Sequence, residues 1–317
     1  MSNIDIENPE GAESIQFSTK TPRLPARFRV KSDKYGWFLT ARSTLPFLAV
    51  LLFIPILGNN LLMWIFAAVM CGWSAYRIQF VLHDTCHMSL FSSRKTNDLV
   101  GISAGLLIGN YFKRYRAIHF LHHKYNGLIE DPQLPDYLSD RQMNKKAFLK
   151  FILEPLWGMR LIPYLRRDLI EADIVKAKIP SPTKSWYFLL FIFQVVIVYY
   201  STSGFTRPMF FLSIYGGMAT FSLFLARLRT LAEHQQVDSS YSDFSRTHKR
   251  NWFDTLMLQD ANFCYHLEHH LYPSVQSRHL PDLLSELTED LHTVDSRGTS
   301  MLRTLSDSYR KLPSSAN

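Results

Sequence analysis

Nine of the twelve histidines of this 317-residue chain fall into four short groups. His83 and His87 form the first group, and their i, i+4 spacing places both rings on one face of a helix. Two further groups share the pattern HxxHH, whose i, i+3, i+4 spacing again gathers the rings on one helical face. These triplets are His119, His122 and His123, and His266, His269 and His270. The fourth group is the single His234. Imidazoles that converge in this way bind metal ions.

The number of histidines predicts more than one metal ion. A structural zinc ion uses four ligands and favours thiolates, so nine imidazoles imply at least two ions. Imidazole binds zinc, copper and iron alike, and ligand type alone leaves the element open. Cys86 and Cys264 lie near the histidines and are interpreted as small, buried apolar side chains. No role is assigned to His248, His279 or His292.

Several polar residues adjoin the histidine groups and are predicted to support them. A metal-bound histidine usually donates its second N–H to a carboxylate or a carbonyl. The carboxylates in question are Asp84, Asp131, Glu233 and Glu268. The alternative for each is a solvated loop or helix-cap residue. Asn262, four residues before His266, is expected to approach the ions through a water.

Apolar segments must position these groups, and they predict a membrane protein. A helix needs about 20 mostly apolar residues to cross the hydrocarbon. Spans are expected at residues 43–57, 61–82, 186–200 and 208–226, with short turns at 58–60 and 201–207. The pattern indicates two helical hairpins. Residues 99–112 are too few to span, which indicates a half-inserted or buried helix. Residues 146–178 mix apolar and basic side chains, as either an interfacial or an ordinary cytosolic helix does.

The basic residues predict the orientation of these spans. The net charge is +8, and of 35 Lys and Arg residues only Arg207 lies in the two short turns. Arg77 lies within a span, and the remaining 33 lie elsewhere. The positive-inside rule therefore places both termini, the central loop and the histidines in the cytoplasm. Binding to nucleic acid is not expected, because no nucleic-acid motif accompanies the charge.

The strings HDTCH, HFLHH and HLEHH, with two hairpins between and after them, resemble the three histidine boxes of the membrane fatty acid desaturase and hydroxylase superfamily. The resemblance covers about residues 40–285. It implies a non-haem diiron centre that activates O2, with two iron ions as cofactor. The implied iron ligands are His83, His87, His119, His122, His123, His234, His266, His269 and His270.

The resemblance also implies a fold, and the composition indicates a division of the chain. The fold expected is an all-α integral membrane protein of four transmembrane helices in two hairpins, with a cytosolic helical cap that bears the histidine boxes. Residues 1–40 are expected to form a disordered cytosolic leader, because early acidic residues and a missing apolar core exclude a signal peptide. A catalytic domain is expected over 41–285 and a polar cytosolic tail over 286–317, whose Ser-rich part from about residue 295 is expected to be disordered. The sequence does not distinguish a bacterial inner membrane from the endoplasmic reticulum.

The implied activity is O2-dependent oxidation of an acyl chain, most of all desaturation of a lipid- or carrier-linked fatty acyl group. The first and third boxes look more like those of acyl-lipid or methyl-end desaturases than those of the acyl-CoA type. A hydroxylase, a ketolase and a terminal-alkene-forming decarboxylase are alternatives within the superfamily. A haem carrier or a zinc transporter would place its ligands near mid-span, and a non-catalytic zinc-binding receptor remains a further alternative.

The remaining expectations concern partners of the reaction. The sequence contains neither a flavin fingerprint nor a cysteine set for an iron–sulfur cluster, which implies a separate electron donor of the ferredoxin or cytochrome b5 type. Basic residues around the second box could attract an acidic donor or contact lipid phosphates, namely Lys113, Arg114, Arg116 and Lys124. Five aromatic residues are expected either to line an acyl tunnel or to face lipid, namely Trp64, Trp73, Phe80, Phe188 and Phe193.

Overall fold

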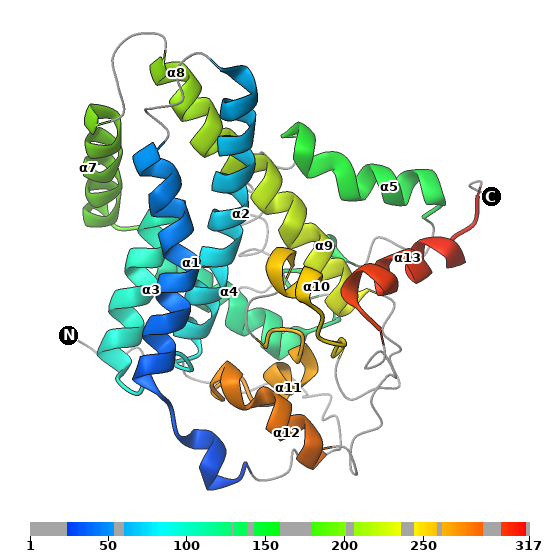
Figure 1. Cartoon of the computed structure of the whole chain (residues 1–317). Helices are drawn as coiled ribbons and strands as arrows, with labels where there is room; N and C mark the ends of the chain where they lie inside the picture. The colour runs from blue at the N-terminus through cyan, green and yellow to red at the C-terminus, as the bar shows by residue number, and fades with distance from the viewer. Residues whose placement is uncertain are drawn as a thin grey trace.

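The computed structural model describes residues 24–53, 60–128, 130–137, 143–158, 179–200, 206–235, 244–258, 262–287 and 299–314. Within these ranges the regular structure is helical, with one isolated antiparallel bridge between Thr247 and Tyr265. The all-α expectation is therefore confirmed for the described part of the chain. Figure 1 shows long helices side by side, with shorter helices gathered at their lower end.

Three described helices are long and apolar enough to cross a membrane. They are α1 (Asp33–Phe53), α2 (Leu61–Cys86) and the continuous segment Met209–His234. Helix α2 packs against both α1 and the segment Met209–His234, which crosses it in Figure 1. Helix α7 (Lys184–Tyr200) coincides with the third predicted span. Its 17 residues are fewer than the three long helices have and fewer than the about 20 that a typical transmembrane helix needs. The span predicted at residues 186–200, the hairpins and the cytosolic cap thus stay predictions.

The helices begin and end at residues that differ from those predicted from hydropathy. Helix α1 starts ten residues early, at Asp33, whose carboxylate accepts hydrogen bonds from the backbone N–H and the hydroxyl of Ser92. Helix α2 starts after Asn60, whose side chain accepts from the first free backbone N–H groups. It runs four residues past the predicted end, to Cys86, because polar residues continue the helix beyond the apolar stretch.

The third long segment is not a uniform α-helix. It runs from α8 (Thr206–Phe211) through two π-helical stretches, η5 (Leu212–Gly216) and η6 (Met218–Ser222), into α9 (Leu223–His234). The backbones of η6 and α2 meet closely, because a Cβ atom on Gly217 would overlap the carbonyl of Ala68. Wider π-helical turns are common near functional sites.

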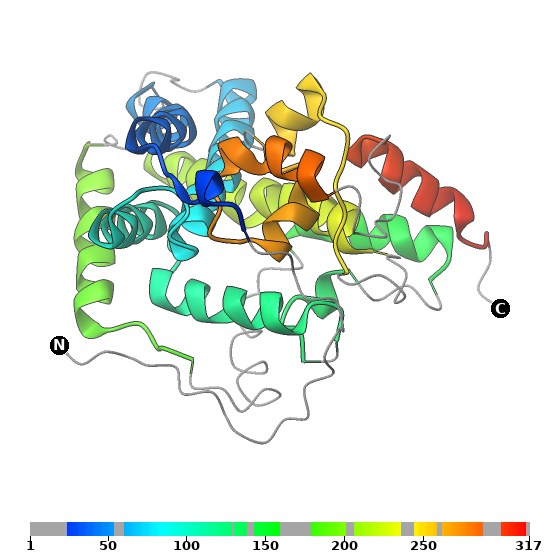
Figure 2. The ribbon, with the colours of Figure 1, turned by 90° about the horizontal axis from the view of Figure 1, so that it is seen from below.

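Shorter helices cover one end of the long ones. Helix α3 (Arg94–Ile108) contains most of the apolar stretch 99–112 and ends at Gly109, whose φ of 71° favours glycine. Helix α4 (Phe112–Tyr125) follows directly. The others in this region are η1 (Ala26–Arg29), α10 (Trp252–Met257), α11 (His266–Leu271), η7 (Ser277–His279) and α12 (Leu280–Leu287). In the view from below, α4, α11 and α12 lie across the ends of the long helices (Figure 2).

A cluster of buried apolar side chains packs four further short helices beside α9. It joins η3 (Leu134–Asp136), α5 (Lys145–Leu153), η4 (Glu154–Trp157) and α13 (Met301–Lys311). The expectation of a disordered tail is wrong for α13, because Met301, Leu305 and Leu312 are buried in this cluster. Residues 159–178 of the predicted amphipathic segment and residues 1–23 of the predicted leader lie outside the described residues. The expectation of a disordered leader is wrong for residues 26–29 and 33–40, which form η1 and the start of α1.

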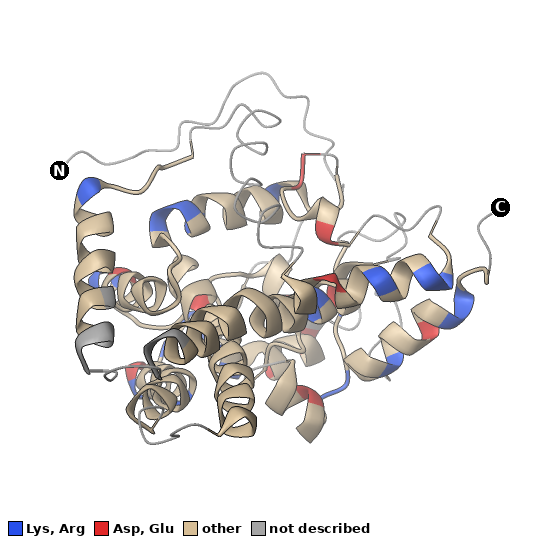
Figure 3. Cartoon of the chain, turned by 90° about the horizontal axis from the view of Figure 1, so that it is seen from above, with Lys and Arg blue, Asp and Glu red and all other residues tan. Residues whose placement is uncertain are grey.

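Charged side chains are distributed unevenly over these helices. Figure 3 shows the long helices mostly without Lys, Arg, Asp or Glu, and the charges gathered on shorter helices such as α5 and α13. Leu52, Leu62 and Phe188 are more than half exposed on apolar helices, as expected where a helix faces lipid.

Candidate metal centre

Helix α2 supplies the first pair of rings at the point where it ends. His83 lies in its last turn, and His87 caps it by donating its backbone N–H to the His83 carbonyl. Met88 follows with a φ of 57°, a conformation that stops the helix. The two ring centroids are 5.1 Å apart, as their i, i+4 spacing predicts.

Helix α4 supplies three rings, and they turn in two directions. His119 and His123 are one turn apart, and their Nε2 atoms lie 3.0 Å from each other near the end of α2. His122 instead approaches His234 and His270, at centroid distances of 4.9 and 5.1 Å. Because neighbouring residues on a helix point about 100° apart, the two adjacent histidines of one HxxHH triplet serve different groups.

The third triplet is divided in the same way. On the short helix α11, His269 packs against His83 at a centroid distance of 4.4 Å. The Nε2 atom of His266 lies 3.1 Å from that of His270 and 3.0 Å from that of His234. His234 is the last residue of α9, so the third long segment ends at the histidines as α2 does.

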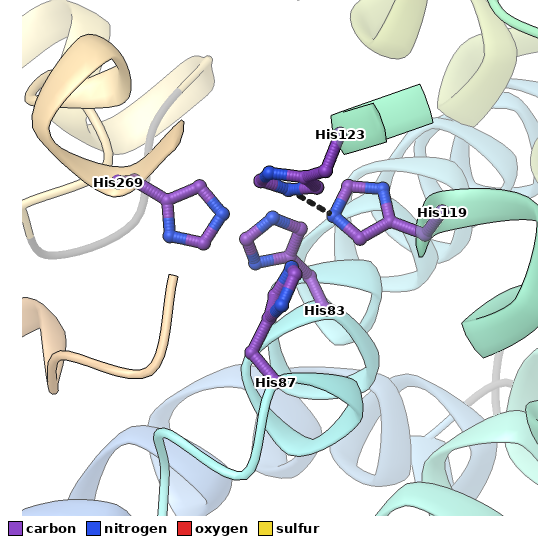
Figure 4. A group of neighbouring side chains, drawn as sticks. All are labelled: His83, His87, His119, His123 and His269. Carbon is purple, nitrogen blue, oxygen red and sulfur yellow. Dashed lines mark hydrogen bonds between the residues drawn. The ribbon is translucent and has the colours of Figure 1, made fainter. Parts of the chain in front are cut away.

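The nine rings therefore form two neighbouring groups. The five-histidine group consists of His83, His87, His119, His123 and His269, and Figure 4 shows these rings turned toward one centre from α2, α4 and α11. The four-histidine group consists of His122, His234, His266 and His270, beside Glu233. The rings of His123 and His270 stack with centroids 4.2 Å apart, so the groups share a boundary. The predicted histidines thus all come together.

Burial keeps the imidazoles outside the spans neutral, which is the form that binds metal. Burial lowers the pKa of His87 to about 3, and Arg116 and His122 add to the shift. Burial and then the neighbouring histidines hold the pKa values of the other such rings well below the usual range. These rings are His119, His123, His266, His269 and His270.

The ring nitrogens are arranged as metal ligands are. The Nε2 atoms of His83, His87 and His269 are buried and have no hydrogen-bond partner among the described residues. In the four-histidine group, Nε2 atoms face each other at 3.0 and 3.1 Å. Two nitrogens that bind one ion at about 2.1 Å and a right angle lie about 3.0 Å apart. Both groups therefore fit a bound metal ion.

Acceptors behind three rings fix which nitrogen faces the centre. Asp84 lies 3.2 Å from Nδ1 of His83, and Asp131 lies 3.0 Å from Nδ1 of His122. The Phe244 carbonyl lies 2.8 Å from Nδ1 of His234. Carboxylates and carbonyls accept, so each Nδ1 carries the proton and each Nε2 lone pair faces its group. Asp84 and Asp131 make the contacts expected of them.

The other predicted supporting residues make different contacts. Glu233 pairs with Arg229 at 2.7 Å and lies beside His266. Glu268 is buried on α11 and accepts a hydrogen bond from the Thr247 hydroxyl. The Asn262 amide donates to the Ser277 carbonyl and accepts from Arg250, at 3.0 and 3.3 Å. These bonds do not connect Asn262 to the histidines, so its approach through a water remains a prediction.

Sequence reasoning missed a buried tyrosine beside the four-histidine group. The Tyr137 hydroxyl donates to Asp131, the carboxylate behind His122. Its ring packs on His234 with centroids 5.0 Å apart. The Asn126 amide lies 3.3 Å from this hydroxyl and 3.4 Å from Nδ1 of His270. Tyr137 therefore touches the surroundings of three rings, although no spacing in the sequence marks it.

Aromatic side chains close the site on the side of α2. Phe263 packs against His83 at a centroid distance of 4.9 Å and against Phe80 at 4.6 Å. Trp64 and Phe80, expected to line a tunnel or face lipid, are buried in packed clusters. Phe188 is 62% exposed on α7.

The three histidines without an assigned role lie apart from both groups or outside the described residues. His248 is buried, and burial, followed by Arg246, lowers its pKa to about 3. Its backbone N–H donates to the Cys264 carbonyl. His279 contacts the Val30 carbonyl at 3.0 Å, and His292 lies outside the described residues. Cys86 and Cys264 are fully buried, as predicted.

Comparison with known proteins connects this geometry to a chemistry. Residues 58–297 match the sequence profile of a family described as Fatty acid desaturase. The chain is 27% identical over 233 residues to dihydrorhizobitoxine desaturase of Bradyrhizobium elkanii. It is 25% identical over 256 residues to sphingolipid delta(4)-desaturase DES1 of Drosophila melanogaster. The alignments cover 67% and 77% of this chain, and 64% and 72% of the two relatives. The profile match contains all four histidine groups.

Proposed function

The chain belongs to the fatty acid desaturase family, and from that premise we propose that it is a membrane enzyme with two histidine-bound iron ions. Its reaction is the O2-dependent desaturation of a lipid- or carrier-linked acyl chain. The observation that carries the proposal is the convergence of nine buried or half-buried histidines into two neighbouring groups at the ends of apolar helices. One group alone would suit a single structural ion, whereas two adjacent groups suit shared redox chemistry.

The balance of the reaction explains why the site is closed. Two adjacent methylenes, O2, two electrons and two protons become an alkene and two water molecules. Bound iron would supply the O2 activation and the oxidising power that an unactivated C–H bond requires. The histidines hold the ions, while Phe263 and Phe80 keep water from the five-histidine group. A dry site protects reactive species from being quenched.

The acyl chain would approach from the lipid side of α1 and α2. A small cavity lies between these helices beside Phe263 and Asp84, lined by Leu39, Val81 and Leu90 among others. Apart from Ser43 and Asp84 its lining is apolar, which suits methylenes rather than a headgroup, and the cavity of about 10 Å³ would have to widen to admit an acyl chain. The polar end of a lipid or carrier would stay near α4 and α11, at the lower end of the spans in Figure 1.

The positive-inside rule supports a cytoplasmic position for the metal centre and both termini. A separate donor of the ferredoxin or cytochrome b5 type would deliver the two electrons there. Of the basic residues near the second box, Arg116 is bound to Asp98 at 2.6 Å. Lys113 and Lys124 are exposed on α4 and are the better contacts for an acidic donor or for lipid phosphate.

Expression in a host that lacks desaturases, followed by mass spectrometry of its fatty acids, tests the proposal. We expect a new product that has lost two hydrogens. His87→Ala and His122→Ala each remove a ligand from a different group, and either should abolish the product. His279→Gln, outside both groups, is the control expected to retain it.

The same experiment separates the alternative chemistries. A gain of oxygen would indicate a hydroxylase or a ketolase, and the loss of a carbon would indicate a decarboxylase. A product that persists in both alanine variants would disprove the metal assignment. Iron analysis of the purified wild-type protein should give about two ions per chain. One zinc ion without O2 consumption would indicate the non-catalytic alternative.

A further inference from the structure

Glu233 approaches its histidine from a different side than Asp84 and Asp131 do. Asp84 and Asp131 contact Nδ1 of His83 and His122, the nitrogens turned away from the group centres. Glu233 Oε2 instead lies 3.5 Å from Nε2 of His266. A carboxylate that only oriented the ring would be expected at the outward nitrogen.

That same His266 Nε2 is the atom around which the four-histidine group converges. It lies 3.0 Å from Nε2 of His234 and 3.1 Å from Nε2 of His270. A carboxylate oxygen of Glu233 and ring nitrogens of His234 and His266 also lie within 4.8 Å of one another. Glu233 therefore lies on the side of His266 where an ion would be bound.

The neighbours of Glu233 hold one oxygen and leave the other directed at the group. Its Oε1 accepts a hydrogen bond of 2.7 Å from Nε of Arg229. The Arg229 guanidinium lies over the rings of Phe80 and Phe263, 4.7 and 5.3 Å from their centroids. These contacts fix the carboxylate, which is buried along with the histidines.

We propose that Glu233 is a direct ligand of the ion in the four-histidine group. This inference rests on the two-ion function proposed above and makes the two sites different. One ion would have five neutral imidazoles, and the other would have four imidazoles and one carboxylate. A carboxylate oxygen is a harder, negatively charged donor, so the two ions should differ in spectroscopic signature.

Mössbauer spectroscopy of the protein loaded with 57Fe tests this assignment without measuring activity. The wild type should give two iron signals of equal area and about two ions per chain. Glu233→Gln keeps an acceptor for Arg229 but removes the charged ligand. We expect one signal to stay unchanged and the other to shift or disappear, with chelator treatment leaving about one ion per chain.

Two controls separate loss of a ligand from loss of a buried ion pair. Arg229→Lys alters the pair but retains the carboxylate, so both iron signals should persist. Asp254→Asn changes a buried carboxylate that accepts from the Met301 backbone outside the site, and it should also retain both. Glu233→Asp is the second variant, because it keeps a carboxylate on a shorter side chain. It should retain both ions, with the second released faster.

Each outcome decides a different question. Unchanged signals in Glu233→Gln would overturn the ligand assignment while leaving the proposed function intact. Loss of both ions in Glu233→Gln and in Arg229→Lys would also overturn it, because the ion pair would then have a purely structural role. A wild-type protein that binds fewer than two ions would disprove the proposed function itself.

Discussion

A histidine that binds metal through one ring nitrogen needs a hydrogen-bond acceptor for the N–H of the other. In this chain the acceptors are carboxylates and a backbone carbonyl. Asp84 and Asp131 are close to histidines in the sequence and could be predicted. The Phe244 carbonyl behind His234 and the Tyr137 hydroxyl on Asp131 could not, because they come from loops with no periodic pattern. Side-chain identity and spacing predicted which histidines converge, whereas the groups behind their outer nitrogens depend on how loops fold back.

Removal of the Tyr137 hydroxyl should weaken metal binding at the four-histidine group. Tyr137→Phe keeps the ring against His234 but takes a hydrogen bond from Asp131, the carboxylate behind His122. Losing such a support typically costs about 10- to 100-fold in metal affinity. Competition with a chelating dye measures this change for the weaker-bound ion.

Tyr35→Phe is the matched control for that variant. The Tyr35 hydroxyl lies 3.3 Å from the Ser277 hydroxyl, away from both histidine groups. Metal affinity should therefore equal that of the wild type. If the two phenylalanine variants bound metal equally well, Tyr137 would have only a packing role.

His248 should make the folded protein sensitive to mild acid. Burial, followed by Arg246, lowers its pKa from 6.5 to about 3 in the folded chain. The unfolded chain therefore takes up a proton as the pH falls below about 6.5, while the folded chain does not, so stability falls. At pH 5 the difference is about 2 kcal/mol.

His248→Leu, of similar volume, should remove that part of the acid sensitivity. Neither ring nitrogen of His248 has a hydrogen-bond partner among the described residues, so an apolar side chain leaves no described donor or acceptor without a partner. Unfolding temperatures at pH 8 and pH 5 give the result, and the pH 8 value isolates any packing change. Equal pH dependence in the wild type and the variant would contradict this account.

At the scale of elements, the site depends on how closely two long helices approach. Helix α2 ends at His83 and His87, and the segment Met209–His234 ends at Glu233 and His234. Gly217 and Gly72 let the two backbones touch, since a Cβ on either would overlap the other helix. The spacing between the five-histidine and the four-histidine group therefore depends on this contact between the apolar parts of the two helices.

Gly217→Ala should separate these helices and reduce both stability and metal binding. Its Cβ would overlap backbone atoms of Ala68, which cannot rotate away as a side chain would. We expect a loss of about 3 kcal/mol, at the upper end of the usual cost of overpacking. Thermal unfolding of the metal-loaded protein in detergent is the measurement.

The neighbouring Gly216→Ala offers the control. Its Cβ would meet Leu212 Cδ1 at 3.6 Å, an ordinary contact, and alanine favours a helix by up to about 1 kcal/mol over glycine. This variant should be neutral or slightly more stable. Equal destabilisation by both alanines would mean that the close approach at Gly217 does not matter.

Which elements could be predicted follows from how each one buries its apolar surface. Helix α2 and the segment Met209–His234 are apolar over most of their length, so hydropathy located them. The π-helical turns of η5 and η6 were not predictable from hydropathy, and they lie where this segment packs against α2. Helix α13 was missed because its polar composition hides a narrow apolar stripe that includes Met301 and Leu305.

At the scale of the whole molecule, the metal centre and the lipid-facing surface belong to the same helices. Helix α2 is capped by the exposed Asn60 at one end and by His87 at the other, and Asp33 at the start of α1 binds Ser92, five residues beyond His87. Under the proposed function, an apolar substrate would therefore reach the ions without leaving the bilayer, while electrons would arrive from the water. These separate routes for substrate and electrons require that the two ends of α2 lie on opposite sides of the membrane.

Cysteine labelling tests that requirement directly. Cys71, Cys86 and Cys264 are fully buried, so a cysteine introduced at an exposed position should react alone. A membrane-impermeant maleimide should label Asn60→Cys in intact cells, but Lys95→Cys only after permeabilisation. The reverse result would place the metal centre outside the cytoplasm. Labelling of both positions in intact cells would show that α2 does not cross the membrane, and the route from lipid to metal would then have to be abandoned.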